Sequence, residues 1–248
     1  MIVYGPVPSW RLGKSLGIDL IGKEKFCSFD CIYCQLGKTR HKTVDRRVFV
    51  ENSKLERELN GLNTIEADVI TFSGMGEPTL AKNLGAAARL AKKFGLPLAI
   101  LTNSSLFNYE DVRKDLASID WIVAKLDAPN DEIFEKINRP HEKIKFDEMI
   151  EAIKEVRKKA KKFSLQMMFV KENKKYAEEM ADLAREIKPD DVQINTPLRK
   201  SPVRPLSKEE IFEIERHFHG LNTINVYSSP PPKVKPIDYE EMRRRRGQ

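Results

Sequence analysis

One stretch of the chain decides the fold, and it reads Val69-Ile70-Thr71-Phe72-Ser73-Gly74-Met75-Gly76-Glu77-Pro78. Its first four residues are β-branched or aromatic, and turn-forming residues follow them at once, which predicts a short buried strand. Similar apolar runs predict further strands at 98–101, 121–124, 163–170 and 192–194. These short runs are apolar throughout, as strands are when both faces of a parallel sheet are covered.

Helical patterns separate these strands. They cover 84–94, 149–160 and 176–187, and a fourth begins at the capping box Ser207-Lys208-Glu209-Glu210. Strands that alternate with helices form a mostly parallel sheet with the helices packed on it. We expect an α/β fold with one domain over residues 1–228, followed at 229–248 by an extended segment and a short basic helix or tail.

Polar residues and glycines gather near the ends of the predicted strands. They are Gly74, Gly76, Glu77, Thr102, Asn103, Ser104, Lys125, Asp127, Asn195 and the inward-facing Gln166. Ligands bind at the carboxyl ends of the strands in parallel α/β sheets, because the loops gather there. The two glycines that flank Met75 also let the backbone approach a ligand closely. We therefore expect these residues to form one binding site.

The composition limits the class of protein. The chain has 248 residues, of which 40% are hydrophobic, and 44 basic against 37 acidic side chains give a net charge of +7. It is too apolar for a disordered chain, and it has no run of about 18 apolar residues that could span a membrane. Its first residues lack the basic and apolar regions of a secretory signal. We expect a soluble, cytoplasmic and monomeric protein.

The net charge is a weak guide to the ligand. Much of the basic excess lies in Arg243, Arg244, Arg245 and Arg246. Clustered cations favour RNA because they displace counterions from its phosphates. A surface rich in Lys and Glu is equally typical of a thermophile. The charge alone therefore does not choose between RNA and a smaller substrate.

All three cysteines fall in one loop, at Cys27, Cys31 and Cys34. An odd number of thiols this close together cannot form a disulfide framework, so we expect them to hold a metal. Thiolate is the usual ligand of iron–sulfur clusters, and the apolar residues between the sulfurs would shield a cluster from water. Zinc is the alternative, and it would need a fourth ligand such as His41.

The cysteine loop and the strand-end motif together resemble a known family. Residues 27–34, Cys-Ser-Phe-Asp-Cys-Ile-Tyr-Cys, are similar to the CxxxCxφC signature of the radical S-adenosylmethionine (SAM) superfamily. Residues 73–79, with Gly76-Glu77-Pro78 among them, resemble its second signature, and Thr102-Asn103 is also typical of it. The resemblance covers residues 15–200 approximately, and it implies a partial (β/α)6 barrel similar to part of a TIM barrel.

This resemblance implies two cofactors and their ligands. Cys27, Cys31 and Cys34 would hold a 4Fe-4S cluster, and Gly76 and Glu77 would hold the amino group of SAM. The other residues that would bind SAM are Tyr33, Gly74, Thr102, Asn103, Ser104, Asp127, Gln166 and Asn195. Lys125 would be a catalytic residue that contacts the substrate, or it would simply pair with Asp127.

The family chemistry also implies an electron donor and a radical. A reduced cluster would pass one electron to SAM, which releases methionine and a 5′-deoxyadenosyl radical that abstracts a hydrogen atom. The donor would be a protein of ferredoxin or flavodoxin type.

Residues 4–17 resemble a narrower group, the small iron–sulfur oxidoreductases related to the tRNA wyosine-base synthase. This resemblance makes a tRNA or RNA base a candidate substrate. The synthase carries extra cysteines for a second cluster, whereas this chain has none beyond its three. Arg11 and Lys14, within the same segment, would close the mouth of the barrel.

Two other functions stay open from the sequence. One is an activating enzyme that places a glycyl radical on a partner protein, with the basic tail as its docking arm. The other is a zinc-bearing nucleic-acid binding module without catalysis. The metal content of protein purified without oxygen would separate a zinc module from an iron–sulfur enzyme.

Overall fold

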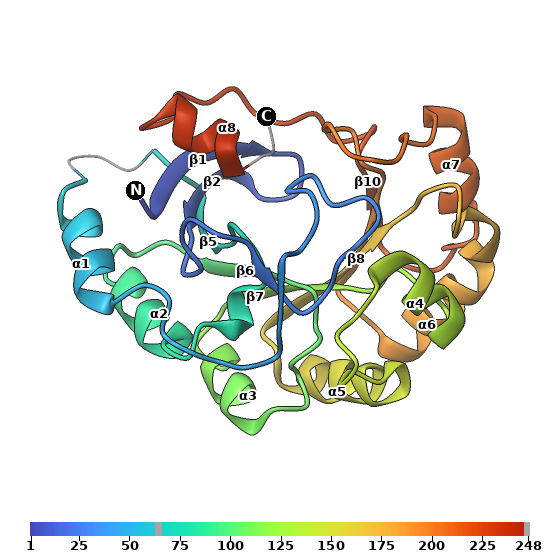
Figure 1. The fold of residues 1–248 in the computed structure, drawn as a ribbon. Coiled ribbons are helices and arrows are strands. Elements are labelled where there is room, and N and C mark those ends of the chain that lie inside the picture. The colour runs from blue at the N-terminus through green and yellow to red at the C-terminus, as the bar shows by residue number, and fades with distance from the viewer. Residues whose placement is uncertain (63–65, 246–248) are drawn as a thin grey trace.

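The computed structural model describes residues 1–62 and 66–245, which form a curled sheet with helices around it (Figure 1). The eight strands of the sheet lie in the order β1 (Val3–Ser9), β2 (Gly13–Ile18), β5 (Val69–Phe72), β6 (Leu98–Thr102), β7 (Trp121–Lys125), β8 (Lys162–Met168), β9 (Asp191–Asn195) and β10 (Thr223–Asn225). β1 pairs with β2 antiparallel, and all other neighbours are parallel. This partial barrel confirms the predicted α/β fold.

The helices pack mainly on the outer face of the curled sheet (Figure 1). They are α1 (Asn52–Asn60), α2 (Leu84–Lys92), α3 (Glu110–Leu116), α4 (Asp131–Asn138), α5 (Phe146–Lys159), α6 (Ala177–Ile187), α7 (Lys208–Arg216) and α8 (Tyr239–Arg245), with short 3₁₀ helices at Pro78–Leu80 and Lys174–Tyr176. Outward-facing strand residues such as Ile70, Ile100 and Leu165 are fully buried beneath them. In the described part of the chain, no helix has the length and apolar character needed to cross a membrane.

The strands and helices predicted from apolar patterns are present. The capping box also forms, since Ser207 Oγ accepts from the Glu210 N–H at 3.2 Å and the Glu210 carboxylate accepts from the Ser207 N–H at 2.8 Å. The sequence pattern did not predict β1, β2, β10, α1, α3 or α4. Glycine and proline, which are rare inside strands, interrupt the apolar pattern of β1 and β2. β10 is only three residues long.

The β2 strand defines the two ends of the barrel. It runs parallel to β5, with Ser15 opposite Val69 and Ile18 opposite Phe72. Residues 10–12, the turn between β1 and β2, therefore lie at the amino-terminal end of the parallel strands (the amino end). The cysteine loop follows β2 and includes the short pair β3 (Phe26–Cys27) and β4 (His41–Lys42). This loop lies at the opposite, carboxyl-terminal end (the carboxyl end).

The barrel is open along one side, because β1 and β10 are the edges of the sheet. The segment after β10 crosses this gap and leads to α8, which packs beside β1 (Figure 1). Arg245 of α8 is buried, and its Nε lies 3.1 Å from Asp19 Oδ2. The basic residues expected to form a tail thus include a buried anchor, whereas Arg246 lies outside the described residues.

Candidate active site inside the barrel

A cavity of about 590 Å³ lies inside the barrel. Twelve of the predicted site residues line it: Cys27, Cys31, Tyr33, Cys34, Gly74, Gly76, Glu77, Thr102, Asn103, Lys125, Gln166 and Asn195. Ser104 and Asp127 do not line the cavity, and both are buried behind its wall. The ends of the parallel strands thus bring together residues that are far apart in the sequence, as predicted.

Each of the three cysteine sulfurs accepts a hydrogen bond from a different side chain. Asn103 Nδ2 donates to Cys27 Sγ at 3.6 Å, and Asn138 Nδ2 donates to Cys31 Sγ at 3.5 Å. The third donor is Lys25 Nζ, which lies 3.1 Å from Cys34 Sγ. Donors aimed at sulfur stabilise negative charge on a thiolate and tune the potential of a cluster that it binds. The loop is therefore built around sulfurs that carry charge.

Asn138 is a site residue that the sequence analysis missed. It ends α4, and this end of α4 also holds the cysteine loop, because the Asp30 N–H donates to the Asn138 carbonyl and the Ile32 N–H to the Ile137 carbonyl, each at 2.9 Å. A signal for α4 was present. Asn130 is its N-cap and accepts from the Ile133 N–H at 3.1 Å, as Asn before two acidic residues often does.

The cysteines suit a cluster better than a single ion. Burial raises the pKa of the Cys31 thiol to about 11 and also raises the pKa of Cys27, so both thiols keep their protons until a metal displaces them. Residues 1–62 and 66–245 gather no three His, Cys, Asp or Glu side chains close enough to bind one metal ion. His41, the expected fourth zinc ligand, stacks on Phe26 at 4.5 Å and lies 3.5 Å from the Glu24 carboxylate. A cubane cluster does not need convergent sulfurs, because its thiolates bind different irons.

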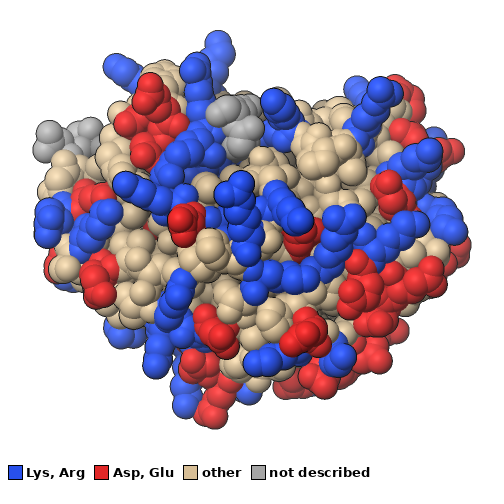
Figure 2. All heavy atoms as spheres, in the orientation of Figure 1, with Lys and Arg blue, Asp and Glu red and all other residues tan. Residues whose placement is uncertain are grey.

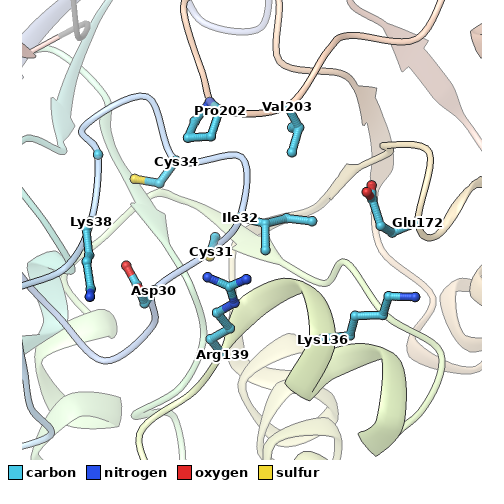
Figure 3. Close-up of a pocket in the computed structure, with 11 residues that line it drawn as sticks. Asp30, Cys31, Ile32, Cys34, Lys38, Lys136, Arg139, Glu172, Pro202 and Val203 are labelled. Carbon is cyan, nitrogen blue, oxygen red and sulfur yellow. The ribbon is translucent and has the colours of Figure 1, made fainter.

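A second cavity of about 510 Å³ lies on the other side of the cysteine loop (Figure 3). Cys31 and Cys34 line both cavities. The charged residues that line the outer cavity are Asp30, Lys38, Lys136, Arg139 and Glu172. Lys and Arg side chains also gather across the centre of this face of the molecule (Figure 2). The cysteine loop thus separates the barrel interior from a basic outer face.

The glycine motif after β5 is joined to the cysteine loop by its backbone. The Phe26 N–H donates to the Met75 carbonyl at 3.2 Å, and the Glu77 N–H donates to the Phe26 carbonyl at 3.0 Å. A Cβ on Gly76 would lie 1.7 Å from that Phe26 carbonyl oxygen, and the φ of Gly76 is +151°. Only glycine fits this position. The motif therefore fixes the distance between the two loops.

The carboxylate of Glu77 accepts four hydrogen bonds from the protein. Its Oε1 accepts from Thr79 N at 3.0 Å, from Thr79 Oγ1 at 2.7 Å and from Thr102 Oγ1 at 2.6 Å. Its Oε2 accepts from the Asn103 N–H at 2.7 Å. A carboxylate has about two acceptor sites on each oxygen, so Oε1 is saturated whereas Oε2 keeps one site. Burial raises the pKa of Glu77, and these hydrogen bonds oppose the shift. This geometry supports a positioning role for Glu77 between two strand ends.

Lys125 faces the cavity and is also paired with Asp127, whereas its contact with the substrate stays a prediction. Its Nζ donates to Gln166 Oε1 at 2.9 Å, lies 3.7 Å from Asp127 Oδ2 and sits 5.1 Å above the Tyr33 ring. Asp127 is held from behind, because it accepts from Tyr33 Oη, from Asn138 Nδ2 at 2.8 Å and from the Met168 N–H at 2.8 Å. The Asp127 carboxylate thus anchors Tyr33 and the end of α4.

Of the other predicted residues, some line the cavity and others lie behind its lining. Ser104 has a φ of +69°, which turns it away from the cavity, and its Oγ donates to the Lys125 carbonyl at 3.2 Å. Asn195 and Gln166 face the cavity. The Gln166 Nε2 group is buried and has no hydrogen-bond partner among the described residues. An unused buried donor at the wall is a group that a ligand could satisfy.

Arg11 and Lys14, which we expected to close the mouth of the barrel, lie away from the carboxyl end. Both lie at or beside the β1–β2 turn, which the antiparallel hairpin carries to the amino end of the barrel. Lys14 pairs with Glu66 outside the barrel, whereas Arg11 lines the inner cavity. Neither residue therefore closes the end that carries the cysteine loop.

Comparison with known proteins agrees with this geometry. The family model of the radical SAM superfamily matches residues 25–184. The chain is 40% identical over 231 residues to UPF0026 protein MJ1312 of Methanocaldococcus jannaschii, covering 89% of this chain and 72% of that protein. It is also 42% identical over 205 residues to UPF0026 protein slr1464 of Synechocystis sp., covering 82% and 77%.

Solved structures share the fold at low sequence identity. SuiB of Streptococcus suis bound to S-adenosylmethionine superposes with a TM-score of 0.65 at 16% identity, over 86% of this chain but only 50% of SuiB. TYW1 with a lysine–pyruvate adduct superposes with a TM-score of 0.62 at 14% identity, over 82% of this chain and 72% of TYW1. The chain thus spans about half the length of SuiB. From the match over residues 25–184 and the identity to its relatives, this chain belongs to the radical SAM superfamily and, within it, to the UPF0026 proteins.

Proposed function

We propose that this radical SAM enzyme holds a 4Fe-4S cluster on Cys27, Cys31 and Cys34, binds SAM beside it in the barrel cavity, and abstracts a hydrogen atom from its substrate. One observation carries the proposal. The three sulfurs line the same cavity as the glycine motif and Lys125. When bound, the cluster and SAM supply the family chemistry: one electron from a donor breaks the C5′–S bond, methionine leaves, and the 5′-deoxyadenosyl radical takes one hydrogen atom from a substrate C–H bond.

The residues of this chain would bind and orient these groups. Asn103, Asn138 and Lys25 would stabilise thiolate charge through their hydrogen bonds to the sulfurs. Glu77 would hold Thr102 and Asn103 in place. Gln166, Asn195 and Lys125 would contact the polar groups of SAM or of the substrate, because they line the cavity.

The test is cluster formation and SAM cleavage by Cys31→Ala, with Arg89→Gln as control because Arg89 is exposed on α2. Without oxygen, wild type and Arg89→Gln should bind iron and sulfide, absorb broadly near roughly 400 nm and form 5′-deoxyadenosine with dithionite and SAM. Cys31→Ala should lose the product. If Cys31→Ala forms 5′-deoxyadenosine at the wild-type rate, the proposal is wrong.

The outer cavity supports a place for the electron donor. Lys38, Lys136 and Arg139 line it together with Asp30 and Glu172 (Figure 3), and it shares Cys31 and Cys34 with the inner cavity. We propose that an acidic carrier of ferredoxin or flavodoxin type docks here, because opposite charge speeds association. Reduction by such a carrier should slow as salt rises and in Lys38→Glu, while reduction of Lys38→Glu by dithionite should match wild type. Equal rates with the protein carrier would contradict this docking site.

An RNA base is the first substrate class to test, because residues 4–17 resemble the wyosine-base synthase group. The two other functions that the sequence left open lose support. Arg245 is buried against Asp19, and Arg244 lies 2.9 Å from Glu241, so two of the three described arginines of the basic cluster are engaged within the protein rather than free to act as a docking arm. His41 is stacked on Phe26, and no single-ion site forms among the described residues, which disfavours the zinc module.

A further inference from the structure

A partly buried arginine at the amino end of the cavity has no counter-ion among the described residues. Arg11 lines the inner cavity, and no Asp or Glu among the described residues pairs with its guanidinium. Its Nε is buried and has no hydrogen-bond partner within the same part of the chain. Burial lowers the pKa of Arg11 to about 10, so the side chain still carries its charge near neutral pH. The cavity thus contains a cation that the described residues do not neutralise.

The other buried arginines of the described chain show how unusual this is. Arg46 pairs with Asp111 and, at 2.5 Å, with Asp115, and Arg245 pairs with Asp19 and Glu241. Arg11 has only the ring of Trp10, 5.3 Å from its guanidinium carbon. A cation–π contact contributes roughly 0.5–2 kcal/mol, which does not offset the desolvation of a charge. An external anion would offset it.

The turn that carries Arg11 is fixed from several sides. Ser9 Oγ accepts from the Arg11 N–H at 3.3 Å and from the Leu12 N–H at 3.1 Å. The Lys14 N–H donates to Asp68 Oδ2 at 2.7 Å, which ties the start of β2 to the residue before β5. Leu12 packs in a buried apolar group with Val69, Ala99 and Val123. Arg11 is therefore held at the cavity on a rigid base.

The anion that Arg11 would bind is not the carboxylate of SAM. The cysteine loop and glycine motif lie at the carboxyl end, and a strand the length of β2 spans roughly 17–20 Å. The lining of the cavity between the two ends carries little negative charge. Its basic side chains are Arg11, Lys125, Arg199 and Arg245, and its one acidic residue among those described is Glu77, whose carboxylate is occupied by four donors.

We propose that Arg11 binds an anionic group of the substrate, a carboxylate or a phosphate, at the amino end of the barrel cavity. The word substrate here depends on the proposed radical SAM function, whereas the anion site itself does not. The planar guanidinium matches the two oxygens of either group. A small acid or a phosphate ester can place its charged end at Arg11 and its reacting carbon toward the cysteine loop.

The test is calorimetric titration of the cluster-loaded full chain with SAM and without reductant. The probes are inorganic phosphate and succinate at constant ionic strength, and the variants are Arg11→Met, Arg11→Lys and the surface control Arg89→Gln. At least one probe should saturate a single site in wild type and Arg89→Gln. Its affinity should fall by roughly 10- to 100-fold in Arg11→Met and by less in Arg11→Lys. The probe that binds more tightly identifies a phosphate ester or a carboxylic acid.

Two outcomes would overturn the inference. One is that neither probe saturates a site in the wild type, and the other is that Arg11→Met binds the better probe within twofold of wild type. Folding is checked separately by the melting temperature of each variant without anion. The formation of 5′-deoxyadenosine by the same wild-type preparation tests the proposed function. An anion site without SAM cleavage would refute that function and leave the inference standing, and SAM cleavage without an anion site would do the opposite.

Discussion

Arg245 and Arg11 both line the barrel cavity, yet their surroundings differ completely. Arg245 makes an ion pair with the buried Asp19, a second with Glu241, and lies over the ring of Tyr4 at 4.7 Å. Arg11 has no ion pair among the described residues, and its guanidinium lies 5.3 Å from the centre of the Trp10 ring. Arg245 is therefore a structural residue. Arg11 is the residue that we propose binds a ligand.

The same contrast separates the two ends of the barrel. At the carboxyl end, the Glu77 and Asp127 carboxylates accept four and three hydrogen bonds from the protein. At the amino end, the Arg11 guanidinium is desolvated without compensation. A network of satisfied hydrogen bonds holds side chains in place before a ligand binds. An unpaired charge lowers the stability of the folded protein, and a bound counter-ion restores that stability. Substitutions at the two ends should therefore differ in size and in sign.

The largest effect is expected for Arg245→Met. This change leaves the buried Asp19 without its cation, and removing one partner of a buried ion pair costs about 3–5 kcal/mol of unfolding free energy. The measurement is the urea unfolding midpoint of the full chain. Arg243→Met, in the same helix but without an ion pair to Asp19, serves as the control. A loss below about 1 kcal/mol in Arg245→Met would remove the contrast with Arg11.

Glu77→Gln should come next. The amide keeps one acceptor oxygen, so it leaves either the Thr102 hydroxyl or the Asn103 N–H without its partner. We expect a loss of about 1–3 kcal/mol and a lower yield of bound iron, because Asn103 also donates to Cys27. Urea unfolding and iron content report the two effects. Full iron content at wild-type stability would mean that the carboxylate does not organise this end.

Asn138→Ala should have a smaller effect on stability and a clear effect on the cluster. It removes one donor from Cys31 and one from Asp127, for a loss of about 1 kcal/mol. Without the hydrogen bond to sulfur, the reduction potential of the bound cluster should become more negative, because the donor favours the more negative reduced state. A potentiometric titration followed by electron paramagnetic resonance measures the shift. Asn108→Ala, exposed and distant from the cysteines, should leave the potential unchanged.

Arg11→Met should have the smallest effect, within about 0.5 kcal/mol of wild type or stabilising. It removes a desolvated charge and breaks no ion pair within the described chain. The measurement is again the urea midpoint, on the same scale as Arg245→Met. A loss similar to that of Arg245→Met would show that Arg11 is a structural residue with a partner inside the protein.

Much of the barrel could be predicted because its central strands are apolar on both faces. β5, β6 and β7 lie under helices on one side and near the cavity on the other, so their sequences are short apolar runs. β1 could not be predicted in this way. It is an edge strand that contains Gly5, Pro6 and Pro8, and an edge tolerates such residues because half of its backbone groups need no partner.

The sequence predicts which residues lie at the site where those residues end a strand or directly follow one. Gly76, Asn103 and Lys125 follow or end strands, and all three line the cavity. Position alone does not determine where a side chain points once the strand has ended. Ser104 turns away at a positive φ, and Asp127 turns back to bind Tyr33 and Asn138. The contacts of Asp127 depend on α4, which is distant in sequence from the cysteine loop. The spacing of residues within one motif cannot predict such a long-range contact.

The pairing of Asp19 with Arg245 also constrains the order in which the molecule can be assembled. Asp19 lies against Gly74, where a Cβ would come within 2.2 Å of its carboxyl carbon, so this carboxylate is part of the wall beside the glycine motif. Asp19 leaves the ribosome well before its cation, which lies 226 positions further along the chain. A nascent chain can form β2, β5 and the cysteine loop before α8 is synthesised. Until α8 has emerged, the Asp19 carboxylate lacks its cation, so during translation we expect the cavity to mature only after that helix has been added.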